Sequence, residues 1–211
     1  MRTRIAFLDF KNALKDYPIF STRDVSKLFP NLHRRRMHEW VGRGLLKRII
    51  KGYYIFSDMQ LDENLLYLVA NRIYDPSYVS LQSALNWYGL IPEFVPQITS
   101  VSTKKTTIFS TELGSFYYGS LKEPLMFGYD LVPSKDGRYN IKMAYLEKAL
   151  LDTLYLDPKL SSEAQFSELR INMELLRETF NKDRFNQFIP LFVNKSFEKR
   201  VKSFMKYLEH A

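Results

Sequence analysis

A basic helix followed by a basic hairpin is the feature that most constrains how this chain folds. Residues 29–56 read FPNLHRRRMHEWVGRGLLKRIIKGYYIF. We expect Asn31 to cap a helix whose inward face carries four residues at helical spacing: His33, Met37, Trp40 and Val41. Gly44 follows where a left-handed residue commonly ends a helix. The pattern predicts one amphipathic helix that begins close to three consecutive arginines.

Two β-prone segments, 45–50 and 53–56, come directly after this helix and meet at Lys51-Gly52, which predicts a tight hairpin. Two helices are expected before it, one ending ahead of Pro18 and one capped by Ser21 or Thr22. Helices followed by a basic hairpin are typical of a winged helix-turn-helix, in which one helix enters the major groove of DNA. We therefore expect a DNA-binding domain over residues 1–57.

The distribution of charge supports this expectation. The formal net charge is +8; residues 1–60 carry 13 Lys and Arg against 5 Asp and Glu, and residues 61–211 carry 18 of each. The whole excess of positive charge thus lies beside the predicted helix and hairpin. A surface charged only for solubility has no reason to be confined in this way, whereas a module that faces phosphates has one.

The candidate DNA-binding residues come from this helix and hairpin: Arg34, Arg35, Arg36, His38, Arg43, Lys47, Arg48 and Lys51. At 100° per residue Arg35 points outward, and Arg34 and Arg36 lie on opposite flanks. Arg35 is our candidate for a contact to guanine O6 and N7, and the hairpin cations are candidates for phosphates. An ordinary solvated helix face is the alternative interpretation of the arginine triplet taken alone.

The second part of the chain, residues 62–211, is expected to be an α+β domain reached through a short linker at 57–61. Asp62 can cap a helix, and the segments 98–102, 106–110, 115–121, 126–132 and 139–144 have the pattern of short strands. We expect these strands to form an antiparallel sheet with hairpin turns at 112–114 and 135–137, followed by a helical C-terminal tail. In the helix expected over 144–156, Lys148 and Asp152 are spaced to form an ion pair, which we expect on the surface.

Residues that would carry chemistry are sparse. There is no cysteine, and the three histidines are His33, His38 and His210, so we expect no metal site, no cofactor and no catalytic residue. Gly119-Ser120 followed by Asp130 approaches a nucleotidyltransferase metal motif, but Val132 replaces its second carboxylate, so we expect Gly119 in a turn and Asp130 at a strand edge. A nucleotidyltransferase, or a metal-dependent nuclease that uses Glu147, Lys148 and Asp152, remains the enzyme alternative. Because no apolar run is long enough for a signal or membrane segment, we expect a cytoplasmic protein.

Three segments together resemble the AbiEi antitoxin family. Residues 39–56 (EWVGRGLLKRIIKGYYIF) are similar to the end of its winged-helix domain, residues 78–92 (YVSLQSALNWYGLIP) to its next segment, and residues 144–155 (AYLEKALLDTLY) to its Glu-Lys-Ala-Leu-Leu-Asp helix. Their order and spacing match over nearly the whole chain. No single one of these motifs is catalytic, so the conjunction carries the resemblance. The triplet Arg34-Arg35-Arg36 departs from the family in being unusually basic.

The resemblance implies a bacterial antitoxin of a type IV abortive-infection system. Such a protein represses its own operon by binding inverted repeats in double-stranded DNA. Its C-terminal domain counters a nucleotidyltransferase toxin without forming a stable complex with it. A plain winged-helix regulator, whose second domain binds a ligand or a partner, is the alternative.

Overall fold

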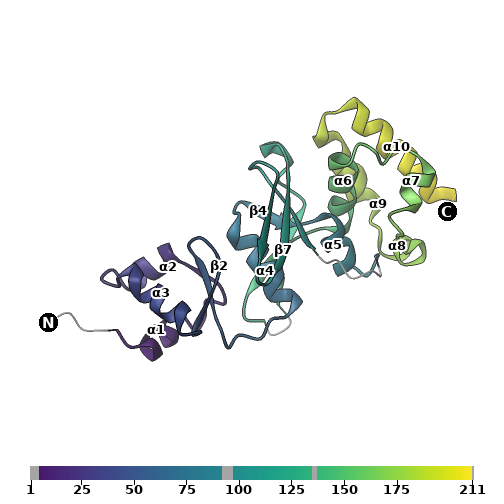
Figure 1. Cartoon of the computed structure of the whole chain (residues 1–211). Helices are drawn as coiled ribbons and strands as arrows, with labels where there is room; N and C mark the ends of the chain where they lie inside the picture. Colours follow the sequence, from purple (N-terminus) through teal and green to yellow (C-terminus); the bar gives the residue numbers. More distant parts are fainter. Residues whose placement is uncertain (1–4, 92–96, 135–136, 211) are drawn as a thin grey trace.

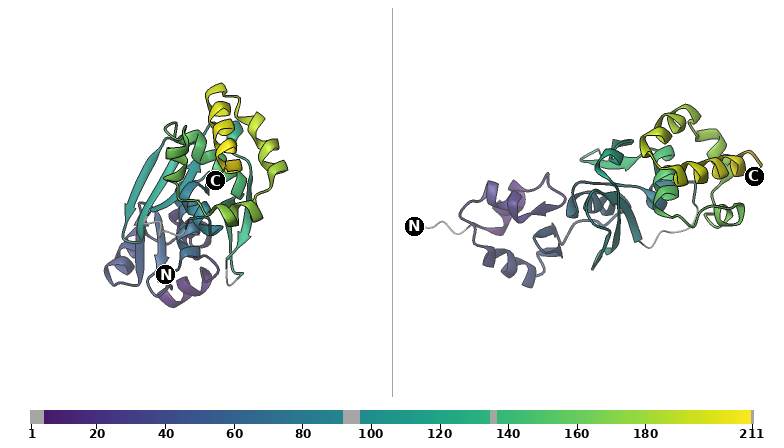
Figure 2. Two further views of the ribbon diagram at one scale, coloured as in Figure 1. Left: turned by 90° about the vertical axis from the view of Figure 1, so that its right-hand side faces the viewer. Right: turned by 90° about the horizontal axis from the view of Figure 1, so that it is seen from above.

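The computed structural model describes residues 5–91, 97–134 and 137–210, and the chain has an α+β fold (Figure 1). A small three-stranded sheet with three helices is followed by a six-stranded mixed sheet and then by a helical C-terminal region. These parts follow one another along the molecule, so that α1 and α10 lie at opposite ends (Figures 1 and 2). The prolines at 92 and 96 and the turn residues at 135 and 136 lie outside the described residues.

The first three helices are α1 (Phe7–Ala13), α2 (Thr22–Leu28) and α3 (Arg34–Gly42). Ser21 caps α2 as expected, and its side chain and that of Asp24 bond each other's backbone amides. The expected cap at Asn31 and the inward position of His33 are wrong. The Leu32 amide donates to the Phe29 carbonyl at 3.0 Å, and this turn delays the start of α3, so His33 precedes the helix and is exposed.

The predicted hairpin is confirmed. Strands β2 (Leu46–Ile50) and β3 (Tyr53–Phe56) pair in antiparallel fashion, and β1 (Phe20–Ser21) pairs with the other edge of β3. Gly52 in the hairpin turn and Gly44 after α3 both have positive φ, at +89° and +68°, which a residue with a side chain adopts only at a cost. The Leu45 amide returns to the Trp40 carbonyl at 2.9 Å and closes the helix end.

The three-stranded sheet is buried on both faces. One face, formed by Phe20, Leu46, Tyr54 and Phe56, packs with α1–α3 around the fully buried Trp40. Isoleucines supply the other face: Ile49 and Ile55, with Ile19 just before β1, belong to the main core of the second part of the chain. Strand β2 also lies beside β6 of the larger sheet. The hairpin is therefore an element of two cores at once.

The larger sheet contains β4 (Ser77–Val79), β5 (Gln97–Ser102), β6 (Thr107–Thr111), β7 (Gly114–Ser120), β8 (Tyr129–Pro133) and β9 (Asn140–Ala144), in the order β6-β7-β5-β4-β9-β8. The expectation of an antiparallel sheet is wrong, because β5 pairs with β7 and β4 with β9 in parallel. Strand β7 inserts between β5 and β6. The three-residue β4 joins β5 to β9 inside the sheet, at a position where the sequence pattern indicated no separate strand. The hairpin expected around residues 112–114 joins β6 to β7.

The edge strand β8 is poorly suited to pairing with a further strand. The Leu131 amide donates to the Asp130 carboxylate at 2.7 Å, and Pro133 has no amide hydrogen. Such features blunt the exposed edges of natural sheets.

Within the described ranges, seven further α-helices follow: α4 (Glu63–Ile73), α5 (Leu81–Trp87), α6 (Leu146–Leu156), α7 (Glu163–Ser167), α8 (Met173–Thr179), α9 (Lys182–Phe188) and α10 (Lys195–His210), with 3₁₀ turns at Glu123–Leu125 and Ile189–Phe192. Asp62 caps α4 as expected, and Asn172 caps α8. In the described part of the chain, none of the helices has the length and apolar character needed to span a bilayer.

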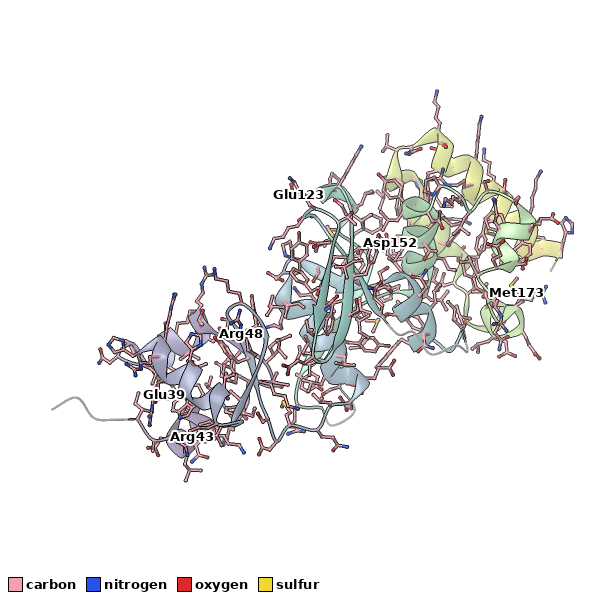
Figure 3. All side chains as sticks on the ribbon, viewed as in Figure 1. Glu39, Arg43, Arg48, Glu123, Asp152 and Met173 are labelled. Atoms are coloured by element: carbon pink, nitrogen blue, oxygen red, sulfur yellow. The ribbon has the colours of Figure 1, made fainter. Side chains whose placement is uncertain are left out.

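The ion pair of Lys148 and Asp152 forms as predicted, but its expected surface position is wrong, because both side chains are fully buried. Helix α6 is covered around almost its whole circumference, by α5 and β9 and by the C-terminal helices α9 and α10 (Figures 1 and 3). The Lys148 ammonium donates to Oδ1 of Asp152, and the Tyr78 and Ser80 hydroxyls donate to Oδ2 at 3.0 and 2.8 Å. The Lys148 ammonium also donates to the Tyr78 hydroxyl at 2.8 Å.

Aromatic rings enclose the rest of the Lys148 ammonium, with the centroids of Phe127 and Phe192 at 4.9 and 5.2 Å. Burial is the largest influence on both charged groups: it lowers the pKa of Lys148 and raises the pKa of Asp152, and their mutual attraction opposes both shifts. The hydrogen bonds and rings thus replace the water that these charges lose.

Removing one partner of this buried pair should be far more damaging than removing a partner of an exposed pair. We predict that Lys148→Met lowers the free energy of unfolding by about 3–5 kcal/mol, since it leaves the Asp152 carboxylate buried without its counter-ion. The matched control is Lys142→Met, whose exposed pair with Asp75 is worth less than about 1 kcal/mol. Urea unfolding measures both, and equal losses would contradict the structural role given to Lys148.

Candidate nucleic-acid interface

A groove of about 630 Å³ lies between α3 and the hairpin. Four cationic or titratable side chains from two elements line it: Arg34 and His38 from α3, and Arg48 and Lys51 from the hairpin. Arg34 and His38 are four residues apart and therefore share one face of the helix. The groove thus gathers side chains that the sequence pattern placed on separate elements.

The local structure of the hairpin explains how its two cations reach the groove. Arg48 lies opposite Tyr54 in the strand pairing, so both side chains point to the face of the sheet that packs against the helices. Lys51 lies in the turn itself. The Thr22 amide at the start of α2 donates to the Gly52 carbonyl at 2.9 Å and fixes the turn against that helix. Arg48 and Lys51 are therefore presented by a rigid frame.

The arginine triplet divides into three environments. Arg34 lines the groove, and Arg35 is exposed, with a side chain 90% accessible and its Nε 3.7 Å from Glu39 Oε1. Arg36 packs inward: its side chain is 19% accessible, its guanidinium lies 5.4 Å from the Trp40 ring centroid, and Nη1 donates to Glu39 Oε2 at 2.9 Å. Arg36 is thereby part of the packing of α3, whereas Arg35 projects into solvent.

The other two predicted residues lie away from the groove. Arg43 follows the end of α3 and is exposed, and Figure 3 shows it well separated from Arg48. Lys47 lies opposite Ile55, so it points to the face of the hairpin that meets the second part of the chain. Of the eight predicted residues, the groove brings together Arg34, His38, Arg48 and Lys51.

A second groove, of about 780 Å³, lies on the far side of the hairpin turn and shares Thr22, Lys51 and Gly52 with the first. Its cations come from both parts of the chain: Arg23, Lys27, Lys51, Arg72, Lys104 and Lys142. Two ion pairs cross it, Arg72 with Asp24 at 3.1 Å and Lys142 with Asp75 at 3.0 Å. Sequence reasoning missed Arg72, Lys104 and Lys142, because residues 61–211 are neutral overall and only the fold brings these three together.

Asp24 links the two parts of the chain at this groove. Burial raises the pKa of Asp24, but hydrogen bonds from Ser21 and the charges of Arg72 and Lys27 outweigh it, so the pKa lies below its ordinary value. The carboxylate is therefore ionised at neutral pH. It completes the capping box of α2 by accepting from the Ser21 amide, and it holds Arg72 of α4 at the same time.

The acidic residues considered for catalysis do not converge. Glu147 is buried and accepts from the Asn181 amide at 2.7 Å and from Arg184 at 3.3 Å, whereas Asp152 faces β4. Asp130 lies on the edge strand β8, as expected, and accepts from the Tyr145 hydroxyl at 3.3 Å. Gly119 is a residue of strand β7, where a turn was expected. Over residues 5–91, 97–134 and 137–210, no group of three or more His, Asp or Glu side chains is placed to hold a metal ion.

No protein-family model matches this chain, and no curated protein matches its sequence.

The different surroundings of Arg35 and Arg36 give a direct test of the packing of α3. We predict that Arg36→Ala lowers the free energy of unfolding by about 1 kcal/mol, because it loses both the contact with Trp40 and the bond to Glu39. The matched control, Arg35→Ala, removes an exposed side chain and should change the free energy of unfolding by no more than about 0.5 kcal/mol. Thermal unfolding followed by circular dichroism compares the two, and a larger loss for Arg35→Ala would reverse this assignment.

Proposed function

We propose that the protein is a transcriptional repressor that binds double-stranded DNA through an N-terminal winged helix-turn-helix. The observation that carries this proposal is the convergence of Arg34, His38, Arg48 and Lys51 on one groove between α3 and the hairpin. The order of elements α1-β1-α2-α3-β2-β3, with strand order β1-β3-β2, supports it. So does the confinement of the net positive charge to residues 1–60.

In this proposal α3 enters the major groove and its exposed face reads base edges. Arg35 projects into solvent and is suited to a bidentate contact with guanine, while Arg34, Arg48 and Lys51 contact phosphates. Arg36 positions the helix through its contact with Trp40 and contacts no base. The second groove continues the basic surface beyond the hairpin turn, so Lys104 and other cations there extend the contact with the DNA backbone.

The division between base and phosphate contacts predicts two different mutant phenotypes. Lys51→Ala should weaken binding to all duplexes alike and reduce the slope of log K against log salt by about 1. Arg35→Ala should cost about 1–3 kcal/mol on a selected sequence and change binding to random DNA little. Fluorescence anisotropy over a series of salt concentrations measures both effects.

Lys199→Ala, an exposed change on α10 at the opposite end of the molecule, is the matched control and should leave the slope unchanged. If Arg35→Ala and Lys51→Ala lose the same affinity on selected and on random DNA, the assigned roles are wrong. If the unmodified protein shows no salt-dependent binding to DNA, the proposed function itself is wrong.

The second part of the chain supports a further role, that of a cytoplasmic antitoxin of the AbiEi type. The segments that carry the resemblance lie far apart in sequence, yet they contribute to one core in the structure: the hairpin through Ile49 and Ile55, β4 and α5 through Tyr78 and Leu81, and α6 through Leu150. We therefore propose that residues 62–211 counter a nucleotidyltransferase toxin. A regulator whose second part binds a ligand, and a nucleic-acid-processing enzyme dependent on Asp130, are the rivals.

The antitoxin proposal is best tested with the full chain. Removing the first 60 residues would expose the core residues that pack against the isoleucine face of the hairpin, so loss of function would be ambiguous. The antitoxin proposal requires a nucleotidyltransferase toxin encoded beside this gene. We predict that the double variant Arg34→Ala, Arg48→Ala abolishes repression of a reporter but still restores growth to cells that express that toxin. Failure of both this variant and the unmodified protein to restore growth would leave repression as the only proposed function.

A further inference from the structure

Glu39 is the only acidic residue of α3, and it lies on the exposed side of a helix otherwise rich in arginine. Its two carboxylate oxygens face the guanidinium groups of Arg35 and Arg36, at 3.7 and 2.9 Å. At 100° per residue Glu39 lies 40° from Arg35 around the helix axis, so both belong to the proposed recognition face. An acid there repels phosphates and weakens binding to DNA of any sequence. Its position therefore calls for a role in selecting sequence.

Gly42 lies on the same face, one turn beyond Glu39, and the fold does not require a glycine there. It is a helical residue without a positive φ, and a Cβ added to it would meet none of the described atoms within 4 Å. Alanine would favour the helix more than glycine does. What glycine provides at this exposed position is clearance, so that another molecule can approach the helix backbone beside Glu39.

We propose that Glu39 is a base-reading residue and that Gly42 leaves the space in which the edge of a base pair reaches it. A carboxylate in the major groove accepts from the N4 amino group of cytosine, as arginine donates to guanine O6 and N7. The proposal rests on the proposed DNA binding and adds the substrate class: an operator with a required cytosine beside the guanine that Arg35 contacts. Arg36, held by Trp40, keeps the carboxylate in place.

Selection from a randomised duplex library tests this directly. The unmodified protein should enrich sequences with one required cytosine. In Glu39→Gln the preference for cytosine over the other bases at that position should fall about tenfold, and binding to random duplex should be at least as tight as that of the unmodified protein. Gly42→Ala should have an equal or higher melting temperature and yet bind the enriched duplex about tenfold more weakly. Glu198→Gln on α10 is the matched control for loss of one acid, and it should enrich the same sequences as the unmodified protein.

The outcomes separate this inference from the proposed function. If Glu39→Gln enriches the same base at every position as the unmodified protein, Glu39 only supports the helix and the inference is wrong. If Gly42→Ala binds the enriched duplex as tightly as the unmodified protein, the assigned clearance is wrong. If the unmodified protein enriches no sequence at all, the proposed DNA recognition fails, and this inference fails with it.

Discussion

The burial of the hairpin on both faces is the constraint on which the arrangement of the molecule depends. Aromatic side chains on one face hold it to α1–α3, and the isoleucines on the other face hold it to the core of the larger sheet. A one-residue slip in the pairing of β2 with β3 would exchange these two sets and disrupt both cores. The position of α3 relative to the larger sheet therefore follows from the register of a single short pair of strands.

A second centre organises the C-terminal half. Two opposite charges are desolvated together on α6, and the structure compensates with two hydroxyl donors from the β4 region and with two aromatic rings, Phe127 ahead of β8 and Phe192 in the 3₁₀ turn after α9. Such a pair adds little to stability compared with well-packed apolar residues. It does require its hydrogen-bonding and aromatic neighbours in one arrangement, because any other leaves a buried charge without compensation. Tyr78, Phe127 and Phe192, which are distant in sequence, must all be in place before Lys148 and Asp152 can leave water.

Local features of the fold were predictable from the sequence, and features that depend on neighbours were not. Gly44, Gly52 and the caps Ser21 and Asp62 act within a few residues, so their signals are complete in the chain itself. The same holds for the strands between residues 97 and 120. The burial of Lys148 could not be read from its spacing to Asp152, because an i,i+4 pair has the same pattern on an exposed and on an enclosed helix. In the candidate site, local patterns identified Arg34, His38, Arg48 and Lys51 one by one, but their meeting in one groove depends on the packing of the hairpin against α3. The cations of the second groove likewise needed the tertiary fold.

The edge strand β8 has a consequence for assembly. Its amide donors are partly consumed by Asp130 and partly missing at Pro133, so a second copy of the chain gains little by extending the sheet across this edge. In the proposed binding to inverted repeats, copies that meet at the β8 edge would do so through side-chain contacts. Contacts of that kind are weak unless the duplex holds the two molecules together, so cooperativity on DNA would be set by the spacing of the half-sites.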